Sequence, residues 1–135
     1  MDSAHFLYEK LEVWQLSMDL VDKIYALLRD FPKEERFALT SQIRRAVISV
    51  PSNIAEGSGR LSNKEKVRFL DIAHGSLYEV LCQMSISNKA GYVKDEDLSD
   101  IKNDAIRIAR MIGGLRRFYL SRSDNTPEDK LDNNE

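Results

Sequence analysis

The residues best suited to bind a charged ligand are arginines near the end of the chain. Five arginines and no acidic residue lie between Ala105 and Arg122. On a helix, Arg110 and Arg117 project within about 20° of each other, and Arg107 lies about 60° from Arg110. Such a row of cations can neutralise nucleic-acid phosphates. The same pattern is typical of a solvated face whose charge suits a helix C-terminus, and the sequence leaves both interpretations open.

Residue patterns for catalysis or metal binding are sparse. Asp71 and His74 have the i, i+3 spacing of a carboxylate–histidine pair in di-iron bundles, but such sites need a second pair and further glutamates. The only other histidine is His5, and Cys82 is the only cysteine, which suits a reducing compartment. The sequence has no phosphate loop, nucleotide fingerprint or zinc spacing. We therefore expect no enzymatic activity, no cofactor and no metal.

A second set of polar residues surrounds Pro51, in a stretch that otherwise has helical periodicity. At 100° per residue the polar side chains share an arc of about 100°, and apolar side chains occupy the opposite side. Ser and Asn weaken a solvated helix, so we expect something other than water to cover the polar face. The polar set is Arg45, Ser49, Ser52, Asn53 and Glu56, and the apolar set is Ile43, Val47, Val50 and Ile54.

Pro51 itself allows two interpretations. Either a new helix begins near it, with Asn53 and Glu56 as a capping pair, or one helix continues through it with a kink. We favour the kinked helix, because the apolar positions keep their phase and a helix from Asn53 would meet Gly57 within four residues. The kink costs about 3 kcal/mol and leaves the Val47 carbonyl without its normal partner.

The elements that must position these residues are helices, since no segment shows the alternation typical of a strand. We expect helices over 7–30, from between 33 and 40 to 58, from Ser62 to about 90, and from Asp95 onward. Ser62 and Glu65 have the spacing of a capping box. The strongest three-and-four periodicity is Leu98, Ile101, Ala105, Ile108, Ile112, Leu115 and Tyr119. Short connections predict an all-α fold, an antiparallel up-and-down four-helix bundle.

Composition predicts one folded domain over residues 1–122. The chain has 135 residues, of which 42% are hydrophobic and 31% charged, as in globular proteins. Residues 123–135 carry five acids and one lysine, so removing their charge of −4 from the total of −2 leaves +2 for the bundle. We expect this acidic tail to be disordered. The sequence shows neither a bilayer-spanning run nor a signal peptide, so we expect a cytoplasmic protein without membrane partners.

Several short segments together resemble a known family. They are Leu11–Gln15, Phe31–Pro32 with Glu35, Gln42–Ala46 with Ser49, Ser52–Gly57, Arg68–Leu70, Ala73, Gly75–Leu77 and Glu79. Over residues 6 to about 119 the chain is similar to four-helix-bundle proteins encoded by intervening sequences of bacterial large-subunit (23S) ribosomal RNA genes. It also resembles the accessory protein of diversity-generating retroelements. The resemblance implies a homopentameric ring and, through the retroelement protein, a basic surface that binds nucleic acid and a reverse transcriptase.

The polar face of the second helix gains a structural interpretation from this resemblance. Small residues Gly75 and Ser76 permit close approach, and Glu79 lies one turn after Ser76. We expect polar contacts within or between subunits that involve Arg45, Ser49, Asn53, Glu56, Ser76 and Glu79. The alternative is that Arg45 and Glu56 are simply exposed, and that the serines merely tolerate the kink.

Two classes of function remain open. The favoured class is a non-enzymatic homo-oligomeric scaffold that binds RNA, DNA or a nucleic-acid enzyme through Arg107, Arg110 and Arg117. The alternative is a protein-only interaction module that uses the face of the second helix or the ring surface. We expect no small-molecule substrate in either case.

Overall fold

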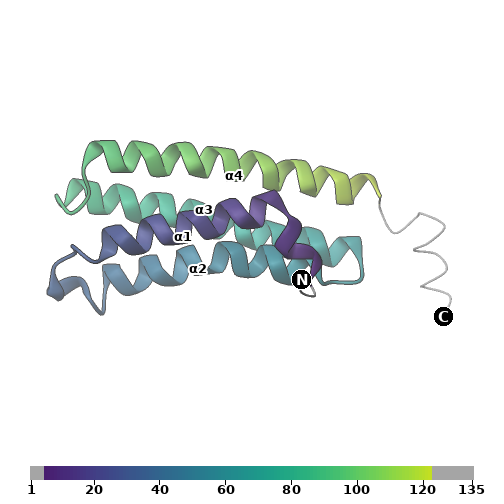
Figure 1. The fold of residues 1–135 in the computed structure, drawn as a ribbon, viewed down its shortest axis with the longest axis horizontal. Helices are drawn as coiled ribbons and strands as arrows, with labels where there is room; N and C mark the ends of the chain where they lie inside the picture. The colour runs from purple at the N-terminus through teal and green to yellow at the C-terminus, as the bar shows by residue number, and fades with distance from the viewer. Residues whose placement is uncertain (1–4, 123–135) are drawn as a thin grey trace, which may run out of the picture.

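Four long helices run side by side along the molecule, and the chain reverses direction from each helix to the next (Figure 1). They are α1 (Glu12–Leu28), α2 (Leu39–Ser58), α3 (Asn63–Lys89) and α4 (Asp95–Ser121), with short 3-10 helices η1 (Leu7–Lys10) and η2 (Lys33–Glu35) before α1 and α2. The computed structural model describes residues 5–122, and the expectation of a disordered acidic tail lies outside them. The prediction of an all-α four-helix fold is confirmed.

The first helix begins later than the sequence pattern predicts, at Glu12. Leu11 has extended backbone angles (φ −74°, ψ 122°), which separate α1 from the 3-10 turn of η1. The Gln15 side chain donates to the carbonyl of Glu9 at 2.8 Å. The rings of Tyr8 and Trp14 meet edge to face, 5.0 Å apart. These contacts fold η1 back against α1, an arrangement that apolar spacing alone does not reveal.

The second helix is continuous through Pro51. Its apolar residues Ile43, Val47, Val50 and Ile54 are fully buried on both sides of the proline. Burial of this face supplies the stabilisation that outweighs the missing hydrogen bond, because each aliphatic side chain contributes about 1.5–3 kcal/mol. The bend at Pro51 stays a prediction.

The boundaries of the last two helices follow local signals in the sequence. The Ser62 hydroxyl accepts from the Glu65 amide at 3.1 Å and caps α3. After α3, Gly91 has φ +86°, the left-handed region that glycine enters without strain. The Asn88 side chain then donates to the Val93 carbonyl at 2.9 Å and to Asp95 at 2.8 Å, which fixes the start of α4.

The apolar stripes of all four helices meet along the axis of the bundle. From α4, the central heptad residues Ile101, Ala105, Ile108 and Ile112 are each 1% exposed, whereas Leu98, Leu115 and Tyr119 pack at its edges. The largest fully buried side chains of the other helices are Leu20, Ile24, Ile43, Ile54, Leu70, Leu77 and Met84. The core therefore uses the periodicity read from the sequence.

The helices approach closely where the end of α2 meets the start of α3. Gly57 is buried there, and a Cβ atom added to it would lie 2.9 Å from Phe69 Cβ and 3.4 Å from the Lys66 carbonyl. Neither neighbour is the far end of a flexible side chain. The contact between α2 and α3 is also the most extensive in the bundle. Gly57 thus permits the packing of these two helices.

We expect Gly57→Ala to lower the free energy of unfolding by about 1–3 kcal/mol, because the helices must separate to admit the methyl group. Gly114→Ala is the matched control, since a Cβ there would lie 3.8 Å from Arg117 Nη2, an ordinary contact. The control should gain about 0.5–1 kcal/mol from helix propensity. Urea denaturation measures both, and equal midpoints for the two variants would contradict the role of Gly57.

Candidate functional site

A small group of polar side chains joins α2 to α3 beside the core. Ser49 Oγ and Ser76 Oγ are 2.8 Å apart and share a hydrogen bond. The Asn53 side-chain amide donates to the Ser49 carbonyl and to Ser49 Oγ, both at 2.8 Å. The three side chains are partly buried. Ser49, Asn53 and Ser76, here called the polar cluster, therefore cross-link the two helices, and the sequence places all three among its candidates.

The other candidates of the polar face point elsewhere. Glu56 forms an exposed ion pair with Arg60 at 2.9 Å, one turn along the helix. Glu79 accepts a hydrogen bond from the Gln83 side chain at 3.2 Å. Arg45 is exposed, and no carboxylate among residues 5–122 lies within ion-pair distance of it. The predicted set thus divides into an interhelical cluster and an outer rim.

Beside the polar cluster, α3 presents a second stripe to the outside. Ile72, Gly75, Glu79, Cys82 and Ile86 recur at spacings of three and four, and all are exposed. Ile72 is 40% and Ile86 50% exposed, while a Cβ added to Gly75 would meet nothing within 4 Å. Gly75 therefore permits no close approach within one chain. The stronger core stripe hides this second stripe in the sequence, although both have the same helical spacing.

The arginines of α4 occupy two kinds of surroundings. Arg107 Nη2 lies 3.3 Å from a Glu12 carboxylate oxygen of α1, an exposed pair. Arg110 and Arg117 are exposed, and neither has a carboxylate within ion-pair distance among the described residues. A methyl group at Gly113 would lie 3.5 Å from Arg117 Nη1, so this guanidinium lies back along α4. Arg110 and Arg117 are thus the two cations of the predicted row that remain available to a ligand.

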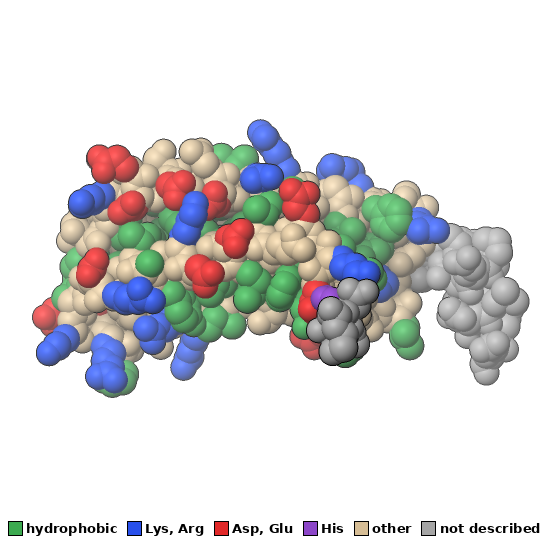
Figure 2. All heavy atoms as spheres, viewed as in Figure 1, with side chains coloured by type: hydrophobic (Ala, Val, Ile, Leu, Met, Phe, Trp, Pro, Cys, Tyr) green, Lys and Arg blue, Asp and Glu red, His purple; other side chains and the backbone are tan. Residues whose placement is uncertain are grey.

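The start of α3 adds cations beside the end of α4. The Asn63 side chain donates to the carbonyl of Arg122, which places the two helix ends together. Arg60, Lys64, Arg68 and Arg122 are all exposed there and are called the basic end. On the face shown in Figure 2, the end from which α4 exits carries Lys and Arg side chains. No sequence signal groups these cations, because only the fold brings their positions together.

One cation of this region belongs to the packing instead. Lys66 donates to the Ser58 carbonyl at 3.0 Å, and its Nζ lies 5.5 Å from the centre of the Tyr119 ring. Burial lowers the pKa of Lys66 from its ordinary value and raises the pKa of Tyr119. Lys66 therefore links α3 to α2 and α4, and it is poorly placed to bind a ligand from solvent.

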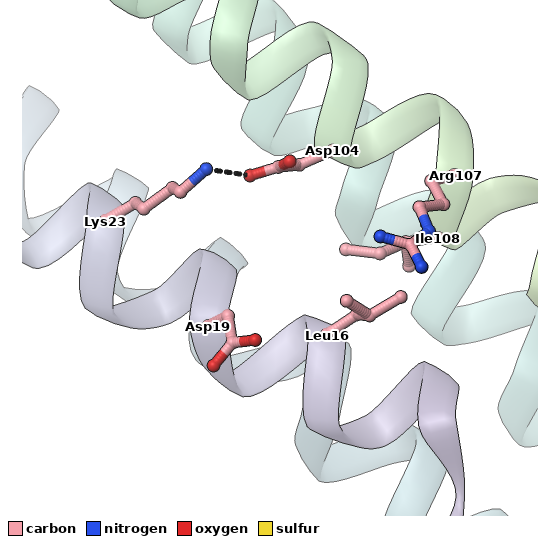
Figure 3. Close-up of a pocket in the computed structure, with 6 residues that line it drawn as sticks. All are labelled: Leu16, Asp19, Lys23, Asp104, Arg107 and Ile108. Atoms are coloured by element: carbon pink, nitrogen blue, oxygen red, sulfur yellow. Dashed lines mark hydrogen bonds and ion pairs between the residues drawn. The ribbon is translucent and has the colours of Figure 1, made fainter.

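The other half of α4 is acidic and faces α1. Lys23 Nζ lies 2.7 Å from Asp104 and 2.9 Å from Asp100, and these hydrogen bonds raise the pKa of Lys23. A groove of about 310 Å³ lies beside this contact, lined by Leu16, Asp19, Lys23, Asp104, Arg107 and Ile108 (Figure 3). Lys23 points across it to Asp104. The charges of Lys23 and Asp104 in this groove are therefore used to hold α1 against α4.

An apolar groove of about 350 Å³ lies between α1 and α2. It is lined by Tyr8, Trp14, Met18, Val21, Ile48, Pro51, Ser52 and Ala55, none of them charged. Met18 and Ile48 are 40% and 43% exposed. Such a groove suits an apolar side chain of a protein partner.

The remaining sequence candidates for chemistry are engaged in other contacts. Asp71 accepts from Arg116 Nε at 2.7 Å, and the His74 ring packs against Tyr78 at 4.9 Å between centroids. Within residues 5–122 no three His, Cys, Asp or Glu side chains are grouped to hold a metal ion. No helix in that part of the chain is long and apolar enough to cross a membrane.

These features define a four-helix-bundle protein with a polar contact between α2 and α3 and a basic second half of α4. The chain belongs to the 23S rRNA-intervening sequence protein family, whose model matches residues 9–114. The resemblance to this family, read from the short sequence segments, is thereby confirmed.

A solved structure shares this fold. It is a protein with unknown function from the S23 ribosomal protein family of Bacteroides thetaiotaomicron, with a TM-score of 0.72 and 23% sequence identity. The alignment covers 78% of this chain and 95% of the other. No curated protein matches the sequence.

The polar cluster predicts unequal effects for two neighbouring substitutions. Asn53→Ala should lower the free energy of unfolding by about 1 kcal/mol or more, because it removes hydrogen bonds from partly buried groups. Glu56→Ala is the control, and it should stay within about 0.5 kcal/mol, because it removes only an exposed pair. Thermal and urea unfolding of both variants measure this difference. An Asn53→Ala protein as stable as the native protein would contradict the structural role of the cluster.

Proposed function

We propose that this protein is a non-enzymatic homo-oligomeric scaffold that binds RNA or DNA through the basic half of α4. The observation that carries this proposal is the pair Arg110 and Arg117, exposed and without carboxylate partners among residues 5–122. Seven residues of helix separate them by about 10 Å. A ring of copies would repeat the pair, and so present a periodic array of cations to a polyanion.

Neutralising these two residues tests the nucleic-acid part of the proposal. Arg110→Gln with Arg117→Gln should weaken binding of a fluorescein-labelled single-stranded RNA, measured by anisotropy between about 50 and 200 mM salt. The slope of log K against log salt should fall by about 1.4, because two phosphate contacts contribute about 0.7 each.

The matched control replaces Arg29 and Arg36 by Gln. Both are exposed arginines near the other end of the bundle. Their loss changes net charge equally, so a similar weakening in both proteins would reduce the effect to bulk charge and contradict a site on α4. No salt-dependent RNA or DNA binding by the native protein would overturn the proposal.

The oligomer part of the proposal is supported by the outward stripe of α3. This stripe has heptad spacing, two exposed isoleucines and a glycine with open space above it. These features suit close packing against a helix of a second copy. The family resemblance points to a closed pentameric ring, in which each copy uses two different surfaces.

Ile86→Lys should lower the solution mass, since it places a charge in the proposed contact. The native mass should be five times the chain mass of 15.5 kDa. Ile106→Lys is the control, because Ile106 on α4 has the same 50% exposure as Ile86. Light scattering measures all three proteins. A monomeric native protein, or equal masses for all three, would contradict the contact.

The second candidate function is a protein-only interaction module. The apolar groove between α1 and α2 favours it, because its uncharged lining suits a helix or loop of a protein. A protein that lacks all nucleic-acid binding, and loses a protein partner on Met18→Glu substitution, would support this candidate over the first.

A further inference from the structure

We propose that the acidic tail, residues 123–135, docks on the basic end of the bundle and shields it from nucleic acid. The docking stands on charge and chain geometry alone. The shielding rests on the proposed function, because Arg117 precedes Arg122 of the basic end by only five residues, about 7.5 Å of helix rise.

The tail leaves the bundle beside its docking surface. Arg122 directly follows the last residue of α4, and its carbonyl accepts from the side chain of Asn63 at the first turn of α3. Arg60 and Lys64 flank that turn. Residues 123–135, even as a chain half extended, span more than 20 Å. The tail therefore reaches every cation of the basic end without any movement of the helices.

The charges of the two surfaces are complementary. The tail carries Asp124, Glu128, Asp129, Asp132 and Glu135 against a single lysine, Lys130. Lys64 and Arg122 have no carboxylate within ion-pair distance among residues 5–122, so their charge is unbalanced. Arg60 and Arg68 hold exposed partners, Glu56 at 2.9 Å and Glu65 at 3.5 Å. Exposed pairs of this kind are weak and readily exchanged.

The acidic half of α4 does not attract the tail. The first half of α4 carries Asp95, Glu96, Asp97, Asp100 and Asp104, which repel an acidic segment. The tethered tail acts at an effective concentration on the order of millimolar, so weak ion pairs suffice for docking. If it covers the basic end for about 90% of the time, the apparent Kd for RNA rises about tenfold.

The first experiment detects docking without any nucleic acid. A carbodiimide joins a carboxylate to a lysine amine when the two lie in contact, and mass spectrometry locates the amide formed. In the full chain at about 20 mM salt, tail carboxylates should couple to Lys64. They should couple far less to Lys33 and Lys89, which are also exposed but lie at the other end of the bundle. The Lys64 product should disappear at about 0.5 M salt. Equal coupling to all three lysines would overturn the docking.

The second experiment measures shielding in the full chain. One variant neutralises the tail by Asp124→Asn, Glu128→Gln, Asp129→Asn, Asp132→Asn and Glu135→Gln. Its control neutralises five exposed acids of the bundle, Asp19, Asp22, Asp30, Glu34 and Glu96, by the same Asn and Gln replacements. Both changes add five to the net charge. We expect the tail variant to bind labelled RNA about tenfold tighter than the native chain, and the control about twofold tighter.

The outcomes separate the tail from the proposed function. Equal gains for the tail variant and its control would overturn shielding and leave nucleic-acid binding standing. Absence of RNA binding in all three proteins would overturn the proposed function together with the shielding, while the cross-links to Lys64 would still decide the docking.

Discussion

The packing of α2 against α3 is the constraint on which the other features of this bundle depend. Gly57 lets the two backbones approach, and the fully buried apolar side of α2 continues through Pro51 without a change of phase. The polar cluster then fits between the same two helices. Once α2 and α3 are fixed, the first turn of α3 meets the last turn of α4. The basic end is therefore a product of core packing, although none of its charges is buried.

The sequence predicts the helices well where apolar spacing and local signals agree. The heptads of α4, the Ser62 cap and the unbroken phase across Pro51 all correspond to observed features. It fails at residues 7–11, where the Tyr8–Trp14 contact and an extended Leu11 replace a helix that spacing alone would allow. The geometry of a single helix correctly places Ser49 and Asn53 on one face. Because contacts between helices leave no local signal, it could not separate Glu56 and Arg45 from their neighbours or find the basic end.

The distribution of charge along α4 explains why a net charge of −2 is a poor guide to this molecule. Acids occupy the first half of the helix. Those of the first turn lie at the positive end of the helix dipole, and Asp100 and Asp104 bind Lys23 of α1. Arginines lie in the second half, although the last turn of the helix carries none. The acids of the first turn therefore also favour the helix itself. A ligand that binds at one end of the bundle therefore experiences an electrostatic potential that the net charge of the whole protein does not describe.

The contact between α1 and α4 depends more on exposed ion pairs, and less on packing, than the contact between α2 and α3. Contact between these helices is less extensive than between α2 and α3, and its polar links are the exposed pairs Lys23–Asp104, Lys23–Asp100 and Arg107–Glu12. Salt screens exposed pairs, whereas apolar packing is little affected. Local opening of a protein begins where buried contacts are fewest. We therefore expect the contact between α1 and α4 to open before the packing of α2 against α3 does.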